Sequence, residues 1–217
     1  MNGILATKTE EYIHSLRPRR DAVLREMERY AARHDVPIVG PACGRMLHQL
    51  ARLIQARRVF EMGSAIGYST IWLARAVGPA GTVYYTDSDP ANAHRAEENF
   101  QRAGVRDRIQ ILVGDALESF RATEGYFDLI FNDVSKTQYP EVFKLAVPRL
   151  REGGLFVTDN VLWSGRAARP ASGKNASTRA IQRFNKMIYR SADLFTTIIP
   201  LRDGFAVCLK NSDNSDK

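Results

Sequence analysis

Polar side chains follow two short apolar runs in the second half of the chain. The run "IFNDVSK" carries Asp133 and Lys136, and the run "FVTDN" ends in Asp159 and Asn160. Two carboxylates and an amide oxygen are hard donors of the kind that Mg²⁺ prefers, with room left for water and substrate oxygens. Lys136 can take a proton from a substrate hydroxyl or stabilise the resulting anion. The pattern predicts a metal site formed by Asp133, Asp159 and Asn160, with Lys136 and Asp133 as catalytic residues.

A glycine-rich stretch in the first half predicts a cofactor site. "VFEMGSAIGYST", residues 59–70, passes from an apolar run through a turn into a helix. The nicotinamide fingerprint G-x-G-x-x-G lets the backbone close on a pyrophosphate, but here Ala65 replaces the middle glycine and Glu61 ends the run. A carboxylate repels a phosphate and suits a cationic ligand, such as the amino group or sulfonium of S-adenosylmethionine (SAM). Gly63 and Gly67 let the backbone approach such a ligand.

Two further acidic residues stand at the ends of later apolar runs. Asp87 ends "VYYTD", where an acidic group accepts hydrogen bonds from a ribose diol. Asp115 follows "ILVG" and can accept a hydrogen bond from an adenine amino group. Each aspartate alone is more typical of a helix N-cap. Together with Glu61, however, they occur in the order that a SAM site requires.

The elements that must position these residues alternate along the chain. Apolar runs occur at 58–61, 82–86, 109–113, 127–132 and 155–158, and helical stretches at 68–77, 90–103, 116–122, 140–150 and 176–190. Such alternation predicts an α/β, Rossmann-like fold with a seven-stranded, mostly parallel sheet and helices on both faces. "FTTIIP" and "GFAVCLK", joined by "LRDG", predict a hairpin that makes the last strand antiparallel. Ligands of such sheets bind beyond the carboxyl ends of the strands.

The domain organisation follows from length and composition. The 217 residues fit one sizeable core. Helices at 8–16, 20–34 and 41–56 predict a helical N-terminal extension over 1–57, before a catalytic domain over 58–210 and a disordered tail over 211–217. No apolar run approaches the roughly 20 residues that span a bilayer, so no membrane partner is expected. Two cysteines without metal-ligand spacing, Cys43 and Cys208, and the lack of a secretory signal predict reduced thiols in the cytoplasm.

These motifs resemble those of a known family. Residues 58–132 are similar to the core of class I SAM-dependent methyltransferases, and residues 10–210 resemble the cation-dependent O-methyltransferases, which include catechol and caffeoyl-CoA O-methyltransferases. The resemblance rests on "FEMGSAIGYSTIWLA", "FDLIFNDVSKTQYPEVFKLAVPRLREGGLFVTDNVLWSG" and "IIPLRDGFAVCLK". It implies SAM and Mg²⁺, or another divalent cation, as cofactors, a homodimer, and a catalytic Lys136. The cofactor-binding positions that we expect are Val39, Glu61, Gly63, Tyr68, Ser69, Asp87, Asp115, Ala116 and Asp133. One position departs from the family: Ser135 stands where relatives often have a second acidic residue.

The methyl acceptor has two candidate classes. A metal favours an acceptor with two adjacent oxygens, such as a catechol-like small molecule, which we favour, or 5-hydroxyuridine in tRNA, which some bacterial members methylate. All of the +7 net charge lies between Val161 and Arg190, which holds seven basic and no acidic residues. A positive rim attracts polyanions, yet this segment has few aromatic residues for base stacking. An NAD-dependent oxidoreductase is the remote alternative, and it gives Asp159 and Asn160 no role.

Overall fold

The computed structural model describes residues 7–16, 18, 21–171 and 175–212. Lys174, in the basic segment, and residues 213–217 of the predicted tail lie outside this part. The chain divides into two compact units, which are Glu11–Glu124, and Gly125–Lys217 together with Met1–Glu10. The predicted division into a helical extension and a catalytic domain stays a prediction.

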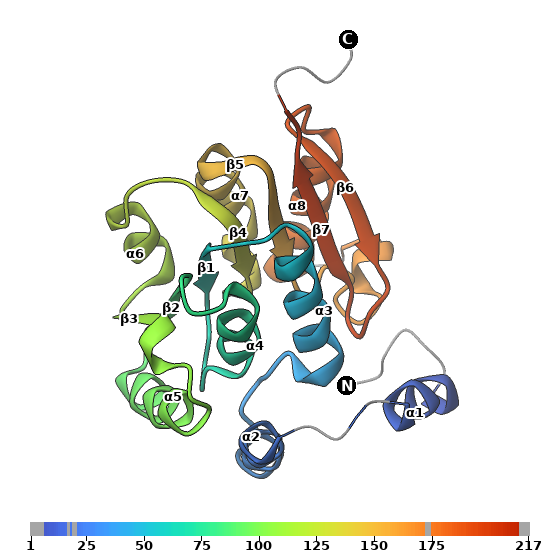
Figure 1. The fold of residues 1–217 in the computed structure, drawn as a ribbon. Coiled ribbons are helices and arrows are strands. Elements are labelled where there is room, and N and C mark those ends of the chain that lie inside the picture. The colour runs from blue at the N-terminus through green and yellow to red at the C-terminus, as the bar shows by residue number, and fades with distance from the viewer. Residues whose placement is uncertain (1–6, 17, 19–20, 172–174, 213–217) are drawn as a thin grey trace. The chain divides into compact units, whose positions relative to one another are not determined.

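The Glu11–Glu124 unit contains three parallel strands. They are β1 (Arg58–Met62), β2 (Thr82–Asp87) and β3 (Ile109–Val113), in the order β3-β2-β1. Asp87 is in register with Val113, so the carboxyl ends of β2 and β3 lie level. Figure 1 shows these strands with the helices of the unit around them.

Capping residues and prolines set the helices of this unit. The helices are α2 (Ala22–His34), α3 (Gly40–Leu53), α4 (Tyr68–Val77), α5 (Pro90–Arg102) and α6 (Ala116–Ala122), and α1 (Thr7–Ser15) spans the boundary of the two units. The side chains of Asp21 and Asp89 cap α2 and α5, because each accepts a hydrogen bond from a free backbone N–H of the first turn. The predicted third helix extended to residue 56, but the chain leaves the helix at Ile54 and takes a positive φ at Gln55.

The Gly125–Lys217 unit holds the predicted hairpin. Its strands are β4 (Phe127–Asn132), β5 (Leu150–Thr158), β6 (Leu194–Ile199) and β7 (Phe205–Lys210), in the order β4-β5-β7-β6. Strand β4 pairs parallel with β5, and β7 pairs antiparallel with both β5 and β6. Helices α7 (Tyr139–Ala146) and α8 (Ala176–Arg190) pack on each other, behind these strands in Figure 1.

One predicted helix is shorter than expected. The stretch 140–150 is helical only to Ala146, and a 3₁₀ turn, Val147–Arg149, leads into β5. Pro148 explains the change, because it lacks the N–H that a continuing α-helix needs. Otherwise the seven-stranded, mostly parallel sheet, its antiparallel last strand and the surrounding helices confirm the predicted Rossmann-like class. Among the described residues, no helix is long and apolar enough to cross a membrane.

Candidate functional site

The loop at residues 63–67 connects β1 to α4. Gly63, Ala65 and Gly67 all have positive φ angles, of 81°, 45° and 82°. A Cβ at Gly67 would lie 2.4 Å from Cε1 of Phe100. Glycine is therefore required at 67, both for the backbone angle and for the space, whereas Ala65 holds an angle that non-glycine residues rarely adopt.

Strand β2 fixes this loop through hydrogen bonds. Ser64 N donates to Thr86 O at 2.9 Å, and Gly63 N donates to the Thr86 hydroxyl at 3.2 Å. Ala65 N donates to Asp87 Oδ2 at 2.9 Å. Asp87, the predicted ribose ligand, thus also holds the loop. This second function could not be read from the sequence.

The other predicted cofactor residues around this loop are mostly buried. Glu61 at the end of β1 is fully buried and accepts a hydrogen bond from the Thr70 hydroxyl. The Tyr68 hydroxyl donates to Glu28 Oε1 of α2 at 2.7 Å. Ser69 is buried in the first turn of α4, and Val39 is buried next to the start of α3. A buried carboxylate behind a glycine-containing loop suits a cationic ligand.

Asp115 and Ala116 lie just beyond β3, where α6 begins. Asp115 caps this helix, because its Oδ1 accepts hydrogen bonds from Leu117 N at 2.9 Å and Glu118 N at 3.0 Å. The side chain of Asp115 is exposed. A carboxylate has further lone pairs, so the cap leaves it able to accept a hydrogen bond from a ligand.

In the Gly125–Lys217 unit, two paired strands bring the predicted metal ligands together. Asn132 and Thr158 are in register, so Asp133 and Asp159 follow at neighbouring strand ends, and Asp159 N donates to Asn132 O at 3.2 Å. Asn160 has a positive φ of 59°, and its N donates to Asp159 Oδ1 at 2.8 Å. The structure thus brings together the residues that the sequence predicts.

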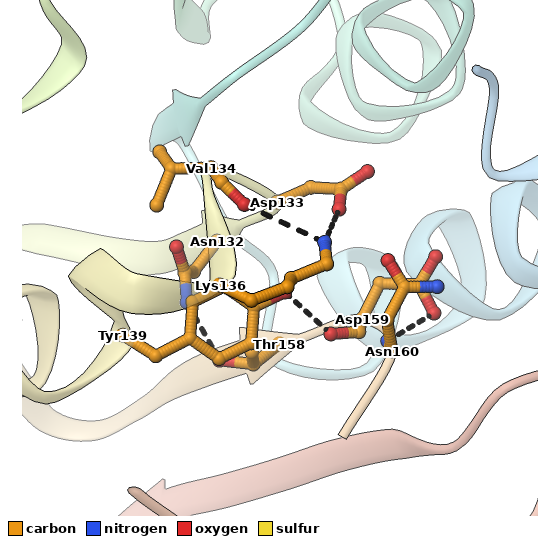
Figure 2. A network of polar contacts seen from close by, with 8 residues as sticks. All are labelled: Asn132, Asp133, Val134, Lys136, Tyr139, Thr158, Asp159 and Asn160. Atoms are coloured by element: carbon orange, nitrogen blue, oxygen red, sulfur yellow. Dashed lines mark hydrogen bonds and ion pairs between the residues drawn. The ribbon is translucent and has the colours of Figure 1, made fainter. Parts of the chain in front are cut away.

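Lys136 lies beside this pair of carboxylates. Its Nζ lies 2.9 Å from Asp133 Oδ1, and the two side chains are 14% and 24% exposed. Figure 2 shows the Lys136 amino group directed at the Asp133 carboxylate, with Asp159 and Asn160 to its other side. A lysine in this place can reach a hydroxyl that binds near the carboxylates.

Ionisation of the Asp133 and Asp159 carboxyl groups is unfavourable in this environment. Burial raises the pKa of Asp133, and the Lys136 ammonium opposes that rise. Burial and the charge of Asp133 raise the pKa of Asp159 to about 7. A divalent cation would relieve both effects, because it neutralises two adjacent acids. The donor set of two carboxylates and an amide fits such an ion, although no three His, Cys, Asp or Glu side chains cluster in the described chain.

Two residues near this pair were missed from the sequence. The buried Tyr139 hydroxyl donates to Asp159 O at 2.8 Å, and the Tyr139 ring centroid lies 5.1 Å from Lys136 Nζ. Its position three residues after Lys136, at helical spacing, was an available signal. Arg202 of the β6–β7 turn lowers the pKa of both aspartates through its charge. Nothing local in the sequence indicates this contact.

The basic segment continues from Asn160 into α8. Arg166 stacks on the Trp163 ring, 4.3 Å from its centroid. On α8 one face is buried and the other carries exposed basic residues, which are Arg179, Arg183, Lys186 and Arg190. A cavity of about 680 Å³ between α7 and α8 is lined by Thr137, Lys144 and Arg183, among others. A second, of about 460 Å³, continues along α8 to Arg190.

Comparisons with known proteins identify the family of this chain. Residues 14–211 match the O-methyltransferase family. The catechol O-methyltransferase of Niastella koreensis is 33% identical, covering 96% of this chain and 99% of that protein. The catechol O-methyltransferase of Mycobacterium tuberculosis is 39% identical, covering 76% of this chain and 77% of that protein.

A solved structure also superposes over nearly the whole chain. The O-methyltransferase of Bacillus cereus, in complex with SAH, has a TM-score of 0.86 and 29% identity and covers 94% of this chain and 98% of that one. The family match over residues 14–211 includes the loop at 63–67 and the strand ends that carry the acidic residues. The chain therefore belongs to the O-methyltransferase family and is a SAM-dependent methyltransferase.

Proposed function

We propose that this enzyme is a divalent-metal-dependent O-methyltransferase of catechol-like small molecules. It methylates a ring hydroxyl that has a second oxygen next to it. The observation that carries the proposal is the pairing of Asp133 and Asp159 at neighbouring strand ends, with Lys136 Nζ 2.9 Å from Asp133. The names of the relatives from N. koreensis and M. tuberculosis support the acceptor class.

The acceptor hydroxyl needs activation. A neutral phenol ionises near pKa 10, about three units above neutral pH, so little of it is a good nucleophile. When bound, a divalent cation supplies positive charge that favours the oxyanion. Asp133, Asp159 and Asn160 would hold it. Lys136 takes the proton of the hydroxyl or, as an ammonium, stabilises the oxyanion.

The remaining residues bind and orient the cofactor. SAM supplies the methyl group on an electrophilic sulfonium. Glu61 places a buried negative charge at the end of β1, Asp87 accepts hydrogen bonds from the ribose, and Asp115 accepts from the adenine amino group. Much of the acceleration then comes from holding both reactants in line.

Metal dependence is tested by removing the proposed ligands. Asp133→Asn and Asp159→Asn should each lower Mg²⁺-stimulated turnover of a catechol at least about 100-fold, the scale of a lost catalytic group. Binding of SAM, measured by calorimetry, should survive largely in Asp159→Asn. Asp193→Asn is the control, because this exposed aspartate lies in the same unit, paired only with Lys210 in the described chain.

Two results would refute this proposal. The first is full activity of the wild type in excess chelator. The second is equal activity of Asp159→Asn and Asp193→Asn at saturating Mg²⁺.

A second candidate acceptor is 5-hydroxyuridine in tRNA, and the basic face of α8 favours it. The four exposed basic residues of α8, from Arg179 to Arg190, are separated by four, three and four positions. They therefore lie along one face of the helix, in a stripe about 16 Å long. Arg183, Lys186 and Arg190 form no ion pair with any residue that the structure describes. A stripe of this kind matches a phosphate backbone.

Salt dependence separates the two acceptors. If RNA is the substrate, the enzyme should retain tRNA at low salt and release it steeply as salt rises. Arg183→Gln/Lys186→Gln/Arg190→Gln should flatten that slope, whereas the charge-matched Arg33→Gln/Arg45→Gln/Arg52→Gln should not. If the wild type does not retain tRNA and both triple variants turn over catechol equally, the tRNA acceptor is excluded and the small-molecule acceptor is supported.

Two other expectations stay predictions. A homodimer is expected from the family resemblance, and sedimentation at several concentrations would test it. A cytoplasmic location is expected from the cysteines, and Cys43 and Cys208 are both buried and free.

A further inference from the structure

Tyr85 of β2 lies under the loop at 63–67. It is fully buried, and its ring packs edge-on against Phe100, with centroids 5.7 Å apart. Its hydroxyl donates to Ala65 O at 2.6 Å. Burial raises the pKa of this hydroxyl well above its ordinary value, so it remains a donor throughout the physiological range.

Both peptide groups of Ala65 are held by β2. The N–H is bound by Asp87 Oδ2 at 2.9 Å, and the carbonyl is bound by the Tyr85 hydroxyl. Between these two hydrogen bonds Ala65 has a φ of 45°, which a residue with a Cβ keeps only where its surroundings impose it. Asn99 Nδ2 donates to the next carbonyl, that of Ile66, at 3.1 Å.

We propose that Tyr85 is a positioning residue for SAM, which fixes the Ala65 peptide so that the loop at 63–67 is already formed before the cofactor binds. Tyr85 acts through Ala65 and has no contact with the cofactor in this role. The inference depends only on SAM binding. It is independent of the metal, of Lys136 and of the acceptor.

The physical reason is preorganisation. If only a fraction of the molecules have the binding conformation, the apparent dissociation constant rises by the inverse of that fraction. Loss of the Tyr85 hydroxyl leaves the partly buried carbonyl of Ala65 without its donor, and the strained angle at Ala65 then relaxes in part of the molecules. The chemical step at saturating SAM is unaffected, because the bound loop has the same conformation.

The neighbouring tyrosine supplies a matched control. The Tyr84 hydroxyl accepts from Arg58 Nε at 3.3 Å, and the Tyr84 ring stacks on Phe60. Tyr85→Phe should raise the Kd of SAM about five- to tenfold, the effect of one lost, partly buried hydrogen bond. Tyr84→Phe should leave that Kd within about twofold of the wild type. Calorimetry without metal or acceptor measures both, so failure of the metal proposal would not affect the result.

Two further measurements exclude a general structural effect. In Tyr85→Phe, kcat at saturating SAM should stay within about twofold of the wild type while the KM for SAM rises with its Kd. Glycine adopts positive φ without strain, so Tyr85→Phe/Ala65→Gly should bind SAM more tightly than Tyr85→Phe. Unchanged SAM affinity in Tyr85→Phe, or a loss that Tyr84→Phe reproduces, would overturn the proposal.

The wild type offers a test without any substitution. Hydrogen exchange at the backbone amides of Ser64, Ala65 and Gly67, which are hydrogen-bonded, should already be slow without SAM, and SAM should slow it little further. Fast exchange that becomes slow only on SAM binding would show a loop that forms on binding, and would contradict the assignment.

Discussion

Lys136 combines three interactions that fix its amino group. Its Nζ lies 2.9 Å from Asp133 Oδ1, donates to Val134 O at 3.4 Å and lies over the ring of Tyr139. Tyr139 in turn holds the backbone carbonyl of Asp159. These contacts connect the Lys136 amino group to the Asp133 carboxylate and, through Tyr139, to the backbone of Asp159. The position of the lysine therefore depends on the same strand ends as the proposed metal site.

Replacing Lys136 should affect the reaction and leave the cofactor in place. Lys136→Gln should lower kcat by about 100- to 10,000-fold, the usual contribution of a general acid or base, with an unchanged Kd for SAM. The activity of Lys136→Arg, measured as kcat over a range of pH, distinguishes the two roles of Lys136. A permanently charged guanidinium can stabilise an oxyanion but cannot accept a proton, so near-normal activity would favour electrostatic stabilisation. A Lys136→Gln enzyme with wild-type kcat would contradict both roles.

At the scale of elements, the contact of the β1–α4 turn with α5 explains why position 67 must be glycine. Helix α5 places Phe100 against Gly67, where a Cβ would lie 2.4 Å from the ring. The Tyr85 ring also packs edge-on against Phe100. The turn therefore depends on a helix that follows it by more than twenty residues in the chain.

Gly67→Ala should therefore destabilise the protein strongly. The positive φ and the clash with Phe100 together cost about 2–4 kcal/mol of the free energy of unfolding. Gly104→Ala is the matched control, since Gly104 also has a positive φ but a Cβ added there would meet no atom within 4 Å, and it should cost about 1 kcal/mol. Urea unfolding monitored by circular dichroism measures both. Equal losses in the two variants would show that the Phe100 contact is unimportant.

At the scale of the whole molecule, the buried acid pair links folding to pH. The folded-state pKa of Asp159, about 7, lies above its ordinary value of 3.8, and burial raises the pKa of Asp133 as well. The folded protein thus binds protons more tightly than the unfolded chain between those values. The free energy of unfolding should fall as pH rises through this window, by about 4 kcal/mol from Asp159.

A divalent cation should reverse that loss. In chelator, the Tm of the wild type relative to that of Asp159→Asn should decrease from pH 5 to pH 8. Addition of Mg²⁺ should raise the Tm of the wild type more at pH 8 than at pH 5. The difference between the wild type and Asp159→Asn isolates this contribution from other titrating groups. A Mg²⁺ effect of equal size at both pH values, or one that persists in Asp159→Asn, would contradict the linkage.

Much of the fold and the site could be predicted because the signals are local. The alternation of apolar runs and helices placed α4 and α6 at the residues where they occur, and each acidic residue followed a recognisable run. The end of α7 was missed because the local effect of Pro148 was outweighed by the helical pattern around it. Tyr85 and Arg202 were missed because their partners are distant in the sequence.

The sequence by itself determined which chemical groups lie at the ends of the strands, because residue type and hydrophobic periodicity can be read from short stretches of the chain. It also determined the family. Only the tertiary structure decided that Asp87 and Tyr85 hold the Ala65 peptide and that two buried carboxylates share one environment. The physical reason is that hydrogen-bond distances and burial depend on how strands pair and helices pack, and those relations join residues that no local pattern connects.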